Sequence, residues 1–137
     1  MNPSLRRAMI FLFGLLVTFI VLRVSLHLSP DSNLDIGPYN IHHLFSGLLL
    51  MTLSVIPLIL HAGNRLIQDM LVLAFAVGLS MALDEWVYLI ATDGSDAAYL
   101  LPVSFWGGVV VIGCASLYTL AIAFYQHKCA PARERNE

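Results

Sequence analysis

Four long apolar runs, separated by short polar segments, dominate the sequence. A helix needs about 20 mostly apolar residues to cross the hydrocarbon core of a bilayer. The segments between the runs carry turn-forming residues, in SPDSNLDIGPYN, AGNRLIQ and TDGSDA. We therefore expect an all-α polytopic membrane protein in which residues 1–127 form one four-helix bundle. The predicted membrane-spanning helices are at about residues 8–28, 41–61, 69–91 and 99–125.

The composition agrees with this pattern. Hydrophobic residues make up 58% of the 137 residues and charged residues 12%, whereas about a quarter of a soluble domain is charged. The formal net charge is −2, and the sequence contains no basic stripe or nucleic-acid motif, so nucleic acid is not an expected partner. The two cysteines show no CxxC spacing, which indicates neither a disulfide framework nor a zinc knuckle.

The first run has one feature of a secretory signal peptide, because Arg6 and Arg7 precede it. However, the run is longer than the apolar region of such a peptide. It ends at Arg23 and His27 rather than at a small-residue cleavage site. We therefore expect residues 8–28 to be a retained helix.

The basic residues predict the orientation. Arg6 and Arg7 precede the first predicted helix, Arg65 lies between the second and third, and Lys128 begins the polar tail at residues 128–137. Four helices threaded in order place all of these on one side. The opposite segments contain aspartates but no Lys or Arg. The positive-inside rule therefore places both termini and the tail in the cytoplasm.

Ionisable side chains inside apolar helices are costly, so each of them needs an explanation. The predicted topology places them near the outer ends of the first three helices: Arg23, His27, His42, His43, Asp84 and Glu85. The halves of the helices nearer the cytoplasm are almost entirely apolar. This segregation predicts an outward-facing polar pocket within the membrane.

Two imidazoles and two carboxylates suit a divalent cation such as zinc, iron or manganese. The candidate ligands are His42, His43, Asp84 and Glu85. Adjacent histidines on a helix diverge by about 100°, so at most one of them is expected to bind directly. Such a metal would activate water for a hydrolase or transferase reaction on a lipid-like substrate. Asp84 or Glu85 would then be the catalytic general base.

Other polar residues are candidates to support this site. Ser46 lies one turn after His42, and Tyr88 lies one turn after Asp84, so each could orient a ligand or a substrate. Arg23 and His27 would contribute from the first helix. Serine and tyrosine at such positions more often make hydrogen bonds between helices.

The same residues admit a structural interpretation. Arg23 can pair with Asp84 or Glu85 and so help the first helix to recognise the third. A histidine in the first turn of a helix can lie among lipid headgroups. The chain would then be a non-catalytic subunit that binds membrane lipid and assembles as a homo-oligomer or with a membrane-protein partner.

A third interpretation is a b-type haem protein. Its axial ligands would be His27 from the first helix and His42 or His43 from the second. We rank it below the other two, because two carboxylates beside an iron porphyrin would be an unusual choice.

Small and aromatic residues predict how the helices pack and how deep they lie. Ala74, Gly78 and Ala82 recur at a spacing of four, which is typical of a face in close contact with another helix. Aromatic residues near the outer ends are expected to form a belt at the membrane interface. They are Trp86, Tyr88, Tyr99 and Trp106.

IHHLFSGLLL, GLSMALDEWVYLI and the YLLPVSFWGG region together resemble a group of small bacterial four-helix integral-membrane proteins. In that group an I-H-H-x-x-x-G helix is followed by a G-x-x-x-x-L-D-E helix. The likeness covers about residues 36–112. It implies a bacterial inner (plasma) membrane location and pairs the two motifs without implying a reaction. The segment TDGSDAAYLLPVSFW is shorter than the corresponding loop of the group. The matching positions are His42, His43, Gly47, Gly78, Leu83, Asp84 and Glu85.

Overall fold

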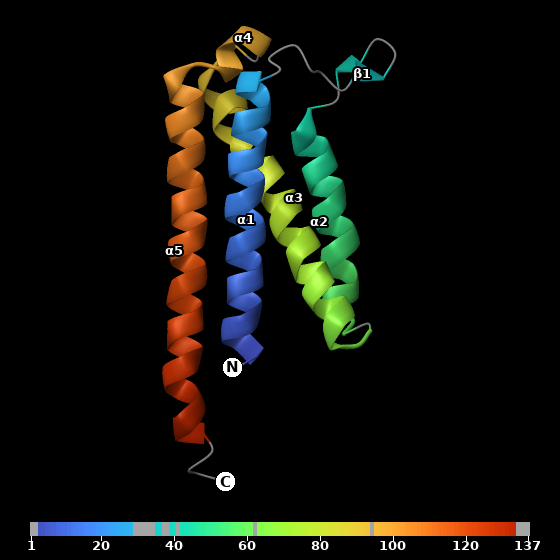
Figure 1. Ribbon diagram of the computed structural model, residues 1–137, viewed down its shortest axis with the longest axis vertical. Coiled ribbons are helices and arrows are strands. Elements are labelled where there is room, and N and C mark those ends of the chain that lie inside the picture. The colour runs from blue at the N-terminus through green and yellow to red at the C-terminus, as the bar shows by residue number, and fades with distance from the viewer. Residues whose placement is uncertain are drawn as a thin grey trace.

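The computed structural model describes residues 3–28, 35–36, 39–40, 42–61, 63–93 and 95–133. The predicted all-α class with four long helices is confirmed within these residues. A one-turn helix and a minimal hairpin, with Asp35 opposite Asn40, complete the described chain. In chain order the elements are α1 (Pro3–Leu28), β1 (Asp35–Ile36), β2 (Tyr39–Asn40), α2 (His43–Ile59), α3 (Arg65–Ala91), α4 (Asp96–Tyr99) and α5 (Pro102–Arg133) (Figure 1).

Three of the described helices are long and apolar enough to cross a membrane. They are α1, α3 and the part of α5 from Pro102 to Lys128. The second predicted span is shorter than expected, because α2 has only 17 residues. At a rise of about 1.5 Å per residue, such a helix falls a few ångströms short of a hydrocarbon core of about 30 Å.

The helices alternate in direction. In Figure 1, α1 and α3 run upward while α2 and α5 run downward. The beginning of α1, the turn between α2 and α3 and the end of α5 therefore lie at one end of the molecule, here called the terminal end. The short helix α4 lies at the opposite end, here called the α4 end.

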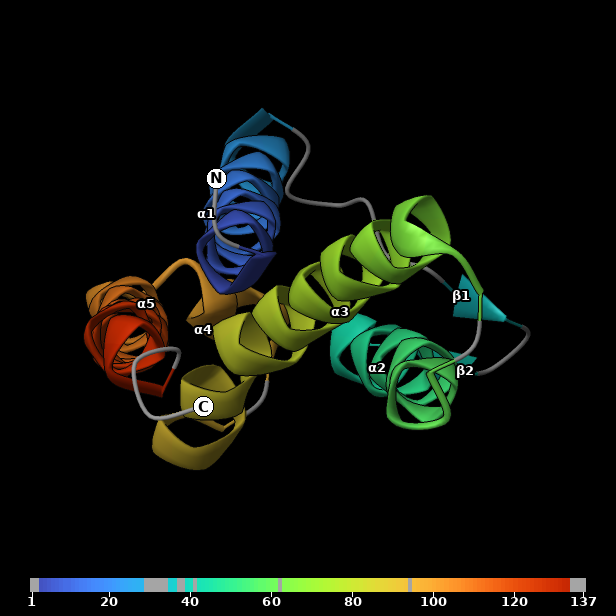
Figure 2. The same cartoon turned by 90° about the horizontal axis from the view of Figure 1, so that it is seen from below.

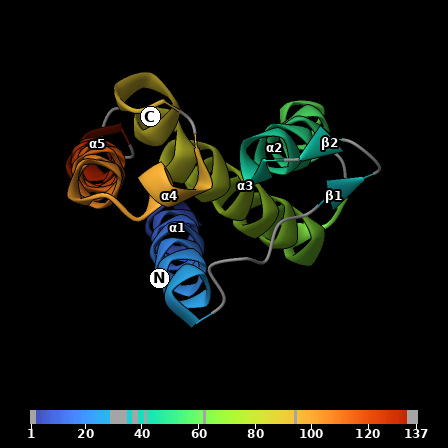
Figure 3. The ribbon, with the colours of Figure 1, turned by 90° about the horizontal axis from the view of Figure 1, so that it is seen from above.

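Helix α3 occupies the middle of the bundle. Figures 2 and 3 show α2 on one side of it and α1 and α5 on the other. Small residues permit its close contact with α1, because a Cβ atom on Gly14 would lie 3.0 Å from the Cβ of Ala76. The Ser80 hydroxyl then donates a hydrogen bond of 2.8 Å to the backbone oxygen of Leu15. Such contacts replace the hydrophobic driving force that a lipid environment does not supply.

Helix α3 begins at Arg65, four residues before the predicted start. Asn64 caps it, because its side-chain oxygen accepts the backbone N–H of Ile67 at 3.1 Å. Asp69 therefore lies inside the helix, where it is buried and pairs with Arg6 at the terminal end. This pair is a second cluster of charge, at the opposite end of the helices from Arg23 and Asp84.

The boundaries of the other helices also differ from the predicted ones. Helix α2 ends at Ile59, and the chain reverses through residues with positive φ at His61 (52°) and Gly63 (86°). Helix α5 begins at Pro102, whose ring suits the first helical position. It continues to Arg133, so the first part of the predicted polar tail is helical. Residues 134–137 lie outside the described part of the chain.

Candidate functional site

The two glycines of the sequence motifs lie against each other where α2 and α3 meet. A Cβ atom on Gly47 would lie 2.5 Å from the backbone oxygen of Gly78, and one on Gly78 would lie 2.6 Å from that of Gly47. The helices are antiparallel, so His43 before Gly47 and Asp84 after Gly78 lie on the same side of this contact. The glycine contact therefore brings the histidines opposite the carboxylates.

The centre of the site is an ion pair between α1 and α3. Arg23 and Asp84 are both buried, with 6% and 0% of their surface exposed. The Arg23 Nε atom donates to Asp84 Oδ1 at 2.7 Å, and Arg23 Nη2 lies 2.7 Å from the same oxygen. The sequence left open whether Arg23 pairs with Asp84 or with Glu85. In the structure Arg23 pairs with Asp84.

The remaining donors of Arg23 reach the other elements of the α4 end. Nη1 donates to the backbone oxygen of Tyr99 at 3.4 Å, and Nη2 donates to the backbone oxygen of Ser104 at 3.1 Å. The guanidinium also lies over the Tyr99 ring, 4.8 Å from its centroid. One side chain of α1 therefore binds α3, α4 and α5.

Tyr99 connects the ion pair to α2. Its hydroxyl donates to the second carboxylate oxygen of Asp84, and His43 Nε2 lies 2.8 Å from the hydroxyl oxygen. Burial, with the adjacent Asp84 carboxylate, raises the pKa of Tyr99 above its ordinary value. Tyr99 therefore remains a neutral donor in the folded protein.

Glu85 contacts both histidines. Its Oε1 atom lies 3.1 Å from His42 Nδ1 and 3.3 Å from His43 Nδ1. Both imidazoles are partly exposed, with 28% and 29% of the side chain accessible, while the Glu85 side chain is only 3% exposed. The partly exposed histidines thus lie over a buried carboxylate.

Glu85 also caps a neighbouring helix. Its Oε2 atom accepts the backbone N–H of Leu44, in the first turn of α2, at 2.6 Å. Within the described chain, the N-cap residue His42 makes no side-chain hydrogen bond of its own to that turn. A carboxylate of α3 therefore accepts the hydrogen bond of an amide that a side chain near the start of α2 would usually accept. Its negative charge also complements the positive end of the α2 dipole.

His43 connects Tyr99 to Glu85. Tyr99 uses its only proton on Asp84, so its hydroxyl oxygen accepts from His43 Nε2. The other ring nitrogen, Nδ1, faces the Glu85 carboxylate. We call the connected set the outer network: Arg23, His42, His43, Asp84, Glu85, Tyr99 and Ser104.

Of the other predicted site residues, Tyr88 packs edge-to-face on Tyr99 of this network, with 4.8 Å between the ring centroids. His27 is exposed near the end of α1, and Ser46 is half-buried in α2. Tyr88 is buried, and its hydroxyl donates to the backbone oxygen of Ser95 at 3.1 Å. Tyr88 and Tyr99 are therefore not part of an exposed aromatic belt, and that prediction was wrong for both. Trp86 is exposed, as a belt requires.

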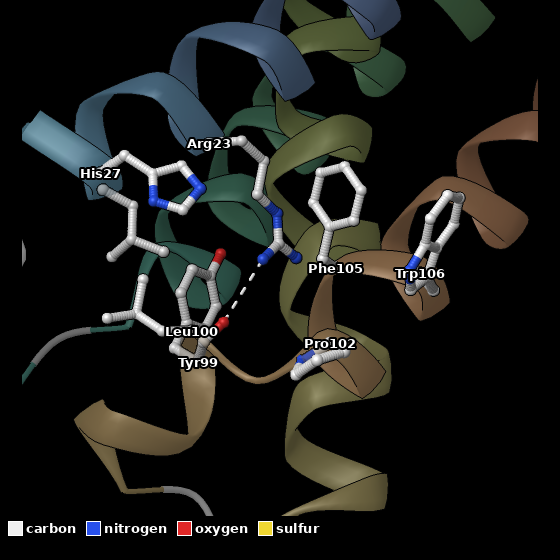
Figure 4. Close-up of a pocket in the computed structure, with 8 residues that line it drawn as sticks. Arg23, His27, Tyr99, Leu100, Pro102, Phe105 and Trp106 are labelled. Carbon is white, nitrogen blue, oxygen red and sulfur yellow. Dashed lines mark hydrogen bonds between the residues drawn. The ribbon is translucent and has the colours of Figure 1, made fainter.

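A cavity of about 290 Å³ lies beside the outer network, between α1, α4 and the start of α5. Figure 4 shows Arg23 and Tyr99 in its wall. The described residues that line it do not include the four predicted metal ligands. Its lining residues are Arg23, Leu26, His27, Tyr99, Leu100, Pro102, Phe105 and Trp106.

The four predicted ligands contact one another in pairs. His42 contacts Glu85, and His43 contacts both carboxylates, with Nε2 3.5 Å from Asp84 Oδ2. Among the described residues, no three His, Cys, Asp or Glu side chains are arranged to hold a metal ion. The metal and haem interpretations remain predictions.

The sequence did not assign a role in the site to Tyr99, Ser104 or Gly108. Tyr99 was predicted only as part of the aromatic belt, and the fold shows that Tyr99 and Ser104 both bind Arg23. Gly108 leaves space for the ion pair, because its Cβ atom would lie 3.2 Å from Arg23 Nη2 and 3.3 Å from Asp84 Oδ1. In the sequence, the available signal for this close contact was a glycine, Gly108, one turn after a serine, Ser104, in an apolar helix.

No family model, curated protein or solved structure matches the chain. The resemblance to small bacterial four-helix membrane proteins therefore remains a prediction that rests on the two motifs. The role of the site has to be inferred from its own geometry.

Proposed function

We propose that this chain is a non-catalytic integral membrane protein whose outer network holds its helices in one assembly. The supporting observation is that the buried polar atoms of the network are all hydrogen-bonded. Among the side chains that the structure describes, no buried nitrogen or oxygen lacks a hydrogen-bond partner. A catalytic group, in contrast, needs an acceptor or donor left available for the substrate.

The energetics of buried charge support this proposal. Removing one partner of a buried ion pair leaves an uncompensated charge, which costs about 3–5 kcal/mol. In the outer network each carboxylate contacts at least two partners from other helices. Any arrangement of the helices that separates these groups is therefore strongly disfavoured, so the network selects one arrangement of the bundle.

The proposed location is the inner (plasma) membrane of a bacterial cell, with both termini in the cytoplasm. Arg6, Arg7 and Arg65 belong to the terminal end of the bundle, and the outer network lies toward the α4 end (Figure 1). The positive-inside rule then directs the terminal end to the cytoplasm and the network outward. A reporter that is active only in the cytoplasm should be active when it is fused to the carboxy terminus. If only a reporter that works outside the cytoplasm is active there, the proposed topology is inverted.

The proposed partners are membrane lipid and, in an oligomer, a second copy or another membrane protein. α2 exposes large apolar side chains at helical spacing, among them Phe45, Leu49 and Leu53. This face contacts lipid in the monomer and offers packing area to a partner helix. Crosslinking of the protein in membranes, followed by mass determination, would distinguish the monomer from the oligomer.

Elemental analysis of detergent-purified protein, beside thermal unfolding with and without a chelator, tests the proposal. We expect no stoichiometric metal and a melting temperature that chelation does not change. Single substitutions at Arg23, Asp84 and Glu85 should each lower that temperature. Metal that is stoichiometric in the wild type and lost in a His43→Ala, Glu85→Gln double variant would overturn the proposal.

The second candidate function is the metal-dependent hydrolase or transferase acting on a lipid-like substrate. It is favoured by the two imidazoles that face two carboxylates while remaining open on one side. A zinc, iron or manganese ion would have to replace the direct contacts between these groups. Asp84 or Glu85 would then serve as general base. The same elemental analysis decides between the two candidates.

A further inference from the structure

A second cavity lies at the terminal end of the bundle, far along the helices from the outer network. Its volume is about 260 Å³. Its walls come from the first turns of α1 and the first turns of α3. The lining residues are Pro3, Arg6, Arg7, Arg65 and Asp69.

The lining of this cavity has an excess of positive charge. Three guanidinium groups and one carboxylate line it, which leaves a formal excess of two positive charges. Asp69 is buried and pairs with Arg6, so the charges of these two lining residues offset each other. Arg7 donates to the side-chain oxygen of Gln68, a neutral acceptor, and Arg65 is exposed. The charges of Arg7 and Arg65 are therefore available to a ligand.

The chemistry of these groups suits a phosphate. A guanidinium presents a planar set of donors that matches phosphate oxygens. Arg65 is also the first residue of a helix of 27 residues, whose N-terminal dipole adds positive potential at the same place. Two independent sources of positive charge thus converge on one cavity.

The position of the cavity identifies the source of the phosphate. α1 and α3 are long enough to cross a membrane, and the cavity lies where both helices begin. In a membrane this is the depth of the lipid headgroups, and basic pockets between helices on the cytoplasmic side are suited to anionic headgroups. We propose that the cavity binds the phosphate of an anionic phospholipid. The inference depends on the proposed membrane location but not on the role of the outer network.

The test is a lipid titration of the full-length protein in a neutral detergent, with binding followed by native mass spectrometry and thermal unfolding. The probes are phosphatidylglycerol, phosphatidylcholine and inorganic phosphate. We expect phosphatidylglycerol to bind and to raise the melting temperature. Phosphatidylcholine should bind much more weakly, and inorganic phosphate should not compete at matched concentration. Equal binding of the two lipids, or competition by inorganic phosphate, would overturn the proposal.

An Arg7→Gln, Arg65→Gln double variant removes the available charges and leaves the Arg6–Asp69 pair in place. Each basic side chain near a membrane surface is worth about fivefold in affinity, so the double variant should bind phosphatidylglycerol roughly 30-fold more weakly. Lys128→Gln, an exposed basic residue of α5 outside this cavity, is the matched control and should bind like the wild type. If the double variant fails to fold, Arg65→Gln alone should still show about a fivefold loss.

An unchanged affinity in the arginine variants, or an equal loss in Lys128→Gln, would refute the site. The two proposals fail separately. Metal in the outer network would overturn the assembly function and leave the lipid result standing, whereas absence of lipid selectivity would leave the outer network unaffected.

Discussion

The carboxylate of Glu85 in α3 accepts the backbone N–H of Leu44 in α2 at 2.6 Å. A helix usually receives such a cap from a residue just before its start. Here the cap comes from the central helix of the bundle, so α2 can form its first turn correctly only when it is docked on α3. The contact therefore makes the start of α2 dependent on tertiary structure.

Glu85→Ala should loosen the start of α2. Loss of a cap costs about 0.5–2 kcal/mol, so amide hydrogen exchange at Leu44 and its neighbours should accelerate. Glu85→Gln keeps an acceptor oxygen and should restore part of the protection. Hydrogen-exchange mass spectrometry of the three proteins measures this. Unchanged exchange across the first turn of α2 in Glu85→Ala would contradict the capping role.

Gly47→Ala and Gly78→Ala should each destabilise the bundle. The added methyl group would lie about 2.5 Å from a backbone oxygen of the opposite helix, so the helices must move apart. Overpacking of this kind costs about 1–3 kcal/mol. Gly113→Ala is the matched control, because its Cβ atom would have no neighbour within 4 Å among the described residues.

Gly113→Ala should therefore leave the melting temperature unchanged or raise it slightly, since alanine favours a helix over glycine. Thermal unfolding in one detergent compares the three variants. Equal stability of Gly47→Ala and Gly113→Ala would mean that α2 and α3 do not meet at the two glycines.

The Arg23–Asp84 pair predicts a non-additive result. Arg23→Met and Asp84→Leu should each lose about 3–5 kcal/mol, because each leaves a buried charge without its partner. The double variant should lose much less than the sum of the two. Arg7→Gln, an exposed arginine beside a neutral acceptor, should change the free energy of unfolding by no more than about 0.5 kcal/mol. Strict additivity in the double variant would contradict the pair.

The sequence predicted the class of the fold because apolar runs of membrane-spanning length are a strong signal. It also predicted which polar residues share one depth. The sequence could not predict that Glu85 binds the backbone N–H of Leu44, because every residue type except proline has such an N–H and the leucine side chain takes no part in the contact. The apolar pattern also placed the start of α3 at Asp69, and only the Asn64 cap, a local signal, marks the earlier start at Arg65.

Four of the candidate site residues, which the sequence placed at a similar depth, contact one another in the structure: His42, His43, Asp84 and Glu85. His27, at a similar depth, is exposed one turn after Arg23 and lines the neighbouring cavity together with it. Tyr99 was assigned to the interface since an aromatic residue near a helix end is more often there than in a buried network.

Tyr99 should make the stability of the folded protein depend on pH in the alkaline range. Its folded-state pKa lies above the ordinary tyrosine value of about 10, since burial and the Asp84 carboxylate disfavour the anion. The stability that results is fully present below about pH 10 and is lost as the pH rises above it, because the unfolded chain then releases a proton that the folded chain retains. The wild type should therefore lose stability between about pH 9 and pH 11.

Tyr99→Phe should remove most of that loss. Near neutral pH the variant should already be less stable by about 1–3 kcal/mol, because Asp84 and His43 lose a hydrogen-bond partner. Tyr118→Phe, at a tyrosine that is 69% exposed, should keep the wild-type pH dependence. Chemical unfolding of the three proteins across this pH range provides the comparison. If Tyr99→Phe and the wild type lose stability in parallel, Tyr99 is not the buried donor of the outer network.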